Sequence, residues 1–132
     1  MVVDAQGGGL GKAIIERLKK SRPNLKVVAV GTNAIATGNM LKAGADEGAT
    51  GENAVVVNSR KAMAILGGIG IIAANSMLGE ITPKMAEAIS SADGPKFLIP
   101  LNKCDLKVVG ARDMTVGEMI DGLVGMVSGV VG

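Results

Sequence analysis

The first twenty residues contain the pattern that most restricts the fold: a short apolar run, a cluster of glycines and an amphipathic stretch. Val2 and Val3 suit a buried parallel strand, which is apolar without alternation. From Leu10 onwards apolar residues recur at helical spacing, with charged residues on the other face. The glycines between them lack a Cβ, so the backbone can turn sharply and bring its N–H groups close to an anion. This order predicts a phosphate-binding loop at residues 5–11, which we call the glycine loop.

The glycine loop departs from each of three known phosphate-binding patterns. The P-loop pattern G-x-x-x-x-G-K-[ST] would place its first glycine at Gln6 and its hydroxyl at Ala13, and the dinucleotide pattern G-x-G-x-x-G also begins at Gln6. The G-x-x-x-G-x-G pattern of short-chain dehydrogenases fits best, with Gly9 and Gly11 in place and Ala5 at the first glycine. That family uses a catalytic tyrosine. The chain has no tyrosine, which excludes a redox enzyme of that type.

Strand and helix patterns alternate along the rest of the chain. Further strands are predicted at residues 25–30, 45–49, 63–66 and 97–101, and helices at 34–43, 54–61, 83–92 and 115–131. The valines of residues 54–61 favour a strand, but the position of this segment between two strands favours a helix, which we expect. Residues 71–78 suit one or two helical turns, and residues 106–109 suit an antiparallel edge strand. The alternation predicts a single Rossmann-like α/β domain, a doubly wound, mainly parallel sheet in a three-layer α/β/α sandwich.

In such a sheet the turns at the carboxyl ends of the strands line one crevice, where ligands bind. The residues expected to bind a ligand there are Gln6, Gly7, Gly8, Gly9, Leu10, Gly11, Thr32, Asn33, Thr50, Glu52, Gly68 and Asn102. Glu52 stands at a predicted helix start and is the first acid to test, although it could also serve only to complement the helix dipole. Asp4 could bind a sugar hydroxyl or tether the glycine loop. The acid that NAD-binding proteins carry after the second strand is replaced by Thr32 and Asn33.

Composition argues against several other functions. The net charge is +2 with both signs interspersed, and Phe97 is the single aromatic residue, so we expect no nucleic-acid partner. The longest apolar run, residues 62–74, is shorter than the roughly 20 residues of a membrane span. The absence of histidine and the single cysteine argue against a zinc site and an internal disulfide. We therefore expect a cytoplasmic protein without a membrane partner or a metal.

The last predicted helix contains glycines at positions 117, 122, 125 and 129. Glycine lowers helix propensity by about 1 kcal/mol relative to alanine, and it also allows another backbone to approach closely. Packing on the sheet of the same chain is one explanation. A contact in a homodimer is the other.

Four segments resemble a bacterial family known as domain of unknown function 3842: DAQGGGLGK, GTNAIATGNMLKAGADEGATGENAVVVN, GIGIIAANSMLGEITPKMAEAI and FLIPLNKC. The resemblance extends from Val3 to about Gly110 and implies a Rossmann-like fold. It implies no activity, substrate or catalytic residue. The chain differs from the family at Ala5, where a glycine is expected, which weakens the expectation of close backbone approach there.

The leading hypothesis is binding of a nucleotide or another phosphorylated small molecule at the glycine loop, with a nucleotide or dinucleotide as the cofactor to consider. If the protein is an enzyme, carboxylates or lysine must transfer protons, because histidine and tyrosine are absent. The main alternative is a non-enzymatic regulatory or assembly module that uses its glycines for packing. A degenerate P-loop nucleotidase is a third hypothesis.

Overall fold

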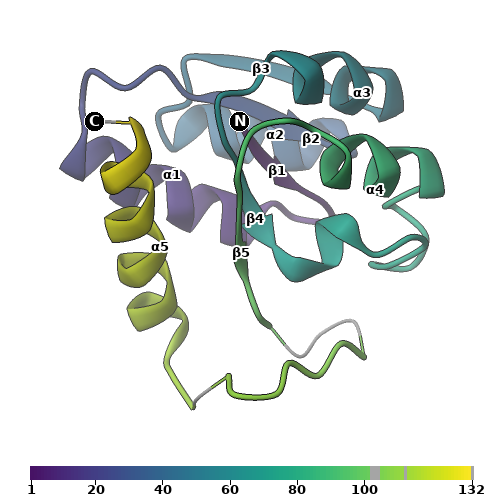
Figure 1. Ribbon diagram of the computed structural model, residues 1–132. Helices are drawn as coiled ribbons and strands as arrows, with labels where there is room; N and C mark the ends of the chain where they lie inside the picture. Colours follow the sequence, from purple (N-terminus) through teal and green to yellow (C-terminus); the bar gives the residue numbers. More distant parts are fainter. Residues whose placement is uncertain (102–104, 112, 132) are drawn as a thin grey trace.

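The sheet consists of parallel strands in the order β3-β2-β1-β4-β5. A computed structural model describes residues 1–101, 105–111 and 113–131 (Figure 1). The strands found in this part of the chain are β1 (Val2–Asp4), β2 (Val28–Gly31), β3 (Glu47–Thr50), β4 (Ile65–Gly68) and β5 (Lys96–Ile99). The chain runs outward from β1 to β3 on one side and from β4 to β5 on the other. The order therefore reverses between β1 and β4, which makes this pair the topological switch point.

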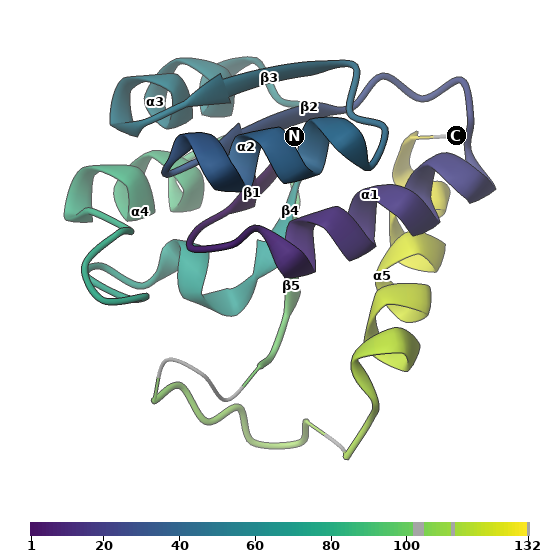
Figure 2. The ribbon, with the colours of Figure 1, turned by 180° about the vertical axis from the view of Figure 1, so that it is seen from behind.

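Helices cover both faces of the sheet, as the two opposite views show (Figures 1 and 2). One face carries α1 (Gly9–Ser21), α2 (Ala34–Lys42) and α5 (Val116–Val131), and the other carries α3 (Glu52–Lys61) and α4 (Pro83–Ser90). A short 3-10 helix, η1 (Ile69–Ile72), follows β4. Each face has its own buried apolar cluster, so the predicted three-layer sandwich with a doubly wound sheet is confirmed.

Local capping fixes where the helices begin. The side chain of Asn33 accepts a hydrogen bond from the Ala36 N–H at the start of α2. Thr82 accepts one of 3.1 Å from the Met85 N–H at the start of α4, and Pro83 occupies the first helical position. The valine-rich segment 52–61 is a helix, with Val55 fully buried against the sheet. Position in the alternation thus outweighs strand propensity in this segment.

Several boundaries differ from the sequence-based expectations. β2 begins at Val28 rather than at residue 25. β4 begins at Ile65 and includes two glycines, whereas Met63 is 70% exposed. Of residues 71–78, the first two complete the single turn of η1, and the others form a bend and turns rather than regular helix. Residues 106–109 form no strand, since the chain leaves the sheet there and Val109 is fully exposed.

The helix α5 packs on the sheet of its own chain through Ile120, Leu123, Val124 and Val127. Among the residues that the structure describes, no helix has the length and hydropathy needed to cross a membrane.

Candidate functional site

A crevice of about 280 Å³ lies at the switch point, between the carboxyl ends of β1 and β4. Its lining comes from the end of β1, the glycine loop, β4, η1 and two further residues: Asp4, Ala5, Gln6, Gly7, Gly8, Gly9, Leu10, Gly68, Ile69, Gly70, Met77 and Leu101. Ligand pockets commonly measure about 300–1,000 Å³, so this crevice suits a small ligand.

Asp4 ties both ends of the glycine loop to β1. Its Oδ1 accepts a hydrogen bond of 2.7 Å from the Ala5 N–H, and its Oδ2 accepts one of 2.7 Å from the Gly11 N–H. The residue is only 8% exposed. Of the two roles considered for Asp4, these contacts support the tether.

Two asparagines hold the carbonyl groups of the glycine loop. Asn33 Nδ2 donates to the Gln6 carbonyl oxygen at 3.0 Å, and Asn39 Nδ2 donates to the Gly7 carbonyl oxygen at 2.8 Å. Gln6 has a positive φ of 52°, a conformation that an ordinary residue adopts only when its surroundings enforce it. Because the carbonyl oxygens are engaged by amides, an anion at the loop meets less negative charge.

Three amides of the glycine loop remain available to a ligand. The Gly8 N–H donates to the Ala5 carbonyl oxygen at 3.0 Å, and the Gly11 N–H is taken by Asp4. The N–H groups of Gly7, Gly9 and Leu10 have no acceptor in the described part of the chain. Gly9 and Leu10 open α1, whose amino-terminal end carries partial positive charge.

The glycines of the loop divide into two kinds. A Cβ on Gly8 would lie 2.8 Å from the Ala36 Cα, and one on Gly11 would lie 2.6 Å from the Met40 Sδ, so both are needed for packing. A Cβ on Gly7 or Gly9 would meet no atom within 4 Å, and neither residue has a positive φ. Neither packing nor backbone conformation explains the glycines at positions 7 and 9.

Glu80, which is not among the predicted binding residues, contacts the glycine loop. Its Oε1 accepts hydrogen bonds from the Gln6 N–H at 2.8 Å, from Thr32 Oγ1 at 2.6 Å and from Asn33 Nδ2 at 2.9 Å. The hydrogen bond from Thr32, followed by that from Gln6, lowers the pKa of the Glu80 carboxyl below its ordinary value. The carboxyl group is therefore ionised at neutral pH.

The loop that carries Glu80 has an unusual backbone. Met77, Leu78 and Gly79 have consecutive positive φ angles of 55°, 57° and 87°, a left-handed turn that residues with a side chain rarely form. Hydrogen bonds within the loop support it, including one of 3.1 Å from the Glu80 N–H to the Met77 carbonyl oxygen. Local sequence signals do not predict such a turn.

The structure brings together half of the predicted binding residues. Six of the twelve line the crevice: Gln6, Gly7, Gly8, Gly9, Leu10 and Gly68. Gly11 packs behind the loop, and Thr32 and Asn33 bind Glu80 beside it. Asn102 lies outside the described residues.

Thr50 and Glu52 lie apart from the crevice. Thr50 shares a hydrogen bond of 2.8 Å with the Thr37 hydroxyl. Glu52 Oε2 accepts one of 2.6 Å from Thr82 Oγ1, which joins the starts of α3 and α4. Of the two glutamates, Glu80 rather than Glu52 thus contacts the glycine loop, in addition to Asp4.

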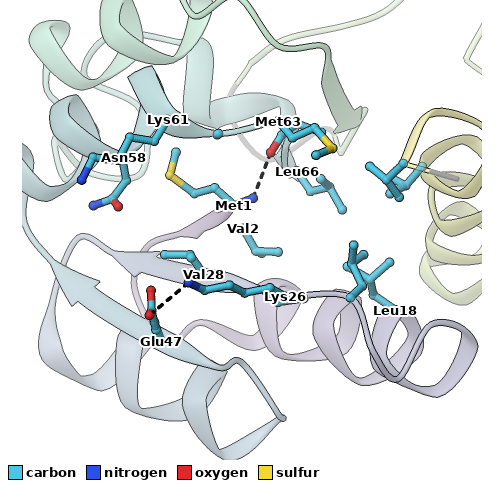
Figure 3. A pocket seen from close by; sticks show the side chains of 16 residues that line it. Met1, Val2, Leu18, Lys26, Val28, Glu47, Asn58, Lys61, Met63 and Leu66 are labelled. Carbon is cyan, nitrogen blue, oxygen red and sulfur yellow. Dashed lines mark hydrogen bonds and ion pairs between the residues drawn. The ribbon is translucent and has the colours of Figure 1, made fainter.

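Further hollows lie elsewhere on the protein. One of about 450 Å³ opens at the amino ends of the strands, where Lys26 Nζ pairs with Glu47 Oε1 at 3.2 Å and the Met1 amino group donates to the Ala64 carbonyl oxygen at 2.9 Å (Figure 3). Another, a groove of about 570 Å³, is lined by β5, α5 and the segment between them. Neither contains a predicted binding residue.

Across the described residues, no group of three or more histidine, cysteine or acidic side chains could hold a metal ion.

Comparison with known proteins identified one family. The model of the family described as domain of unknown function 3842 matches residues 1–131. The chain belongs to this family. The match includes the glycine loop, the loop with Glu80 and α5, so the crevice is built entirely within the family's domain. No curated protein and no solved structure matched the chain.

Proposed function

We propose that this member of the family binds the phosphate group of a nucleotide or another phosphorylated small molecule at the glycine loop. The observation that carries the proposal is the set of free amides of Gly7, Gly9 and Leu10 beside the switch-point crevice. Amides at a helix amino terminus bind anions through hydrogen bonds and through the helix dipole. The 13-residue helix α1 supplies both.

The open space at Gly7 and Gly9 supports the proposal over a packing role alone. Packing alone explains the glycines at positions 8 and 11, because a side chain at either position would collide with α2. Gly7 and Gly9 would tolerate a side chain within the chain itself. Glycine at these positions instead allows a ligand to approach the backbone closely.

A dinucleotide is the least supported form of this ligand. The adenosine half of a dinucleotide lies beyond the end of the second strand in Rossmann-like domains. Thr32 and Asn33 occupy that position here, and both donate hydrogen bonds to Glu80. The crevice volume of about 280 Å³ also favours a smaller molecule.

The proposal is one of binding rather than of catalysis. Asp4 is the one ionisable side chain in the described lining of the crevice, and both of its oxygens accept backbone hydrogen bonds. General acid–base chemistry needs a group free to exchange a proton with the substrate.

Calorimetric titration with inorganic phosphate, AMP and NAD tests the proposal. We expect phosphate and AMP to bind the wild-type protein and Gly9→Val to abolish that binding, because the new side chain fills the approach to the loop. Gly122→Val is the matched control, since Gly122 also has open space but lies on α5. If none of the three ligands binds, or if Gly9→Val binds them unchanged, the proposal is wrong.

A second candidate function, assembly through α5, has its own observation. Met126 and Val130 are 63% and 53% exposed, and a Cβ on Gly122, Gly125 or Gly129 would meet no atom within 4 Å. This apolar face could seat a second copy of the chain. Light scattering should then show a dimer without ligand that Gly125→Leu disrupts and Gly38→Leu on α2 leaves intact. A monomeric wild-type protein excludes it.

A further inference from the structure

We infer that the carboxylate of Glu80, which contacts the glycine loop beside the crevice without lining it, makes the phosphate site selective for a sugar that carries a single phosphate group. The carboxylate would accept hydrogen bonds from the sugar hydroxyls and repel a second phosphate. The inference rests on phosphate binding at the glycine loop, as proposed above.

The Glu80 carboxylate is held in one orientation with one oxygen available. Oε1 receives three hydrogen bonds, from Gln6, Thr32 and Asn33. Oε2 has no donor among the described residues. An ionised carboxylate only accepts hydrogen bonds, so Oε2 can accept one from a ligand group such as a hydroxyl.

This carboxylate lies close to the free amides. Oε1 is 2.8 Å from the Gln6 nitrogen. Three covalent bonds join the Gln6 and Gly7 nitrogens, which are therefore no more than about 4 Å apart. The carboxylate thus lies within about 7 Å of the Gly7 N–H. A sugar attached to a phosphate at Gly7 can reach it.

The charge of Glu80 distinguishes between ligands. Its three hydrogen bonds favour the ionised form, so a fixed negative charge lies beside Gln6, next to the free Gly7 N–H. Hydroxyl groups satisfy this charge, whereas a second phosphate is repelled and leaves Oε2 without a donor. The small crevice excludes much larger molecules in addition.

The substitution Glu80→Gln tests the inference with little change in shape. Glutamine retains the Oε1 acceptor for the three donors but replaces Oε2 with an NH₂ donor and removes the charge. The probes are inorganic phosphate, glucose 6-phosphate and glucose 1,6-bisphosphate, measured by calorimetry. The control is Glu87→Gln, the same change at an exposed position on α4.

In the wild-type protein and in Glu87→Gln, glucose 6-phosphate should bind roughly tenfold tighter than either inorganic phosphate or the bisphosphate, as expected for a hydrogen bond to a charged group. In Glu80→Gln this preference over phosphate should largely vanish and the bisphosphate should gain affinity. Glu80→Asp keeps the negative charge, but its side chain is one methylene shorter and its oxygens no longer reach the sugar. This variant should therefore lose the preference for glucose 6-phosphate over inorganic phosphate while still rejecting the bisphosphate.

The two proposals fail in different ways. If the wild-type protein binds none of the three probes, phosphate binding itself is wrong and the inference falls with it. If inorganic phosphate binds but the ratio between the probes is the same in wild type, Glu80→Gln and Glu80→Asp, the role of Glu80 alone is wrong.

Discussion

Thr32 Oγ1 donates a hydrogen bond of 2.6 Å to Oε1 of Glu80, a residue 48 positions further along the chain. The bond connects the turn after β2 with the loop that leads into α4. Through the same oxygen, Glu80 also holds the Gln6 N–H of the glycine loop. Three βα connections are thereby joined by one carboxylate beside the crevice.

This carboxylate should make the glycine loop sensitive to acid. Hydrogen bonds lower the pKa of Glu80 in the folded protein, with that from Thr32 the largest cause. The contribution of Glu80 to folding is therefore complete above its unfolded pKa and disappears as the pH falls through its folded pKa. An NMR titration should show the Glu80 carboxyl and the Gln6 amide titrating together, below the ordinary glutamate range. A Glu80 pKa at or above that range contradicts the contact, and Glu80→Gln should remove the transition of Gln6.

Alanine should destabilise the protein at Gly8 but not at Gly9. Gly8 has a φ of 72°, and a Cβ there would lie 2.9 Å from the Ala36 carbonyl oxygen. Gly8→Ala should lower the free energy of unfolding by about 1–3 kcal/mol. Gly9→Ala should leave it unchanged or raise it by up to about 1 kcal/mol, because Gly9 is helical and unobstructed. Urea denaturation measures the free energy of unfolding of both variants. Equal losses would contradict the conclusion that a side chain collides with α2 at Gly8 but meets open space at Gly9.

The contact of Gly11 with Met40 should be visible as coupling between the two residues. A Cβ at Gly11 would lie 2.6 Å from Met40 Sδ and 3.0 Å from the Asp4 Cβ. Gly11→Ala should cost about 1–3 kcal/mol through overpacking. In Met40→Ala the added methyl group has room towards α2, so the second substitution should cost less than in the wild-type background. Strictly additive losses in a double-mutant cycle would refute the contact.

Thr82 should stabilise α4 through its hydroxyl group. Its Oγ1 caps the Met85 N–H and donates to Glu52 at the start of α3. Thr82→Ala should lower the free energy of unfolding by about 0.5–2 kcal/mol, as is typical for the loss of a helix cap. Thr82→Ser should restore most of it because serine retains the hydroxyl. If serine is as destabilising as alanine in thermal denaturation, the hydroxyl is not the cause.

The sequence was most informative where local patterns decide the structure. The patterns of residues 1–20 predicted β1 and α1 on either side of the glycine loop, and the pattern of residues 83–92 predicted α4. The alternation of segments then sufficed for a doubly wound sheet. All of these features depend on residues close together in the chain.

Long-range contacts decided what the sequence did not predict. Gly67 lies inside β4 rather than in a turn. A Cβ there would lie 2.8 Å from the Val3 carbonyl oxygen, so the glycine is needed for the close packing of β4 against β1. The helix α2 turns Ala36, Thr37 and Met40 towards the core, whereas its isoleucine, Ile35, is 70% exposed. Glu80 reaches the glycine loop only through the left-handed turn at residues 77–79, which no local signal indicates.

The amide resonances of the glycine loop test phosphate binding most directly. In ¹⁵N–¹H correlation spectra recorded during titration with inorganic phosphate, the amides of Gly7, Gly9 and Leu10 should shift most and saturate together. The Gly8 and Gly11 amides, which already donate to Ala5 and Asp4, should move less, and Gly122 should not move. An unchanged glycine loop at saturating phosphate, or shifts confined to the hollow at the amino ends of the strands, would contradict the account.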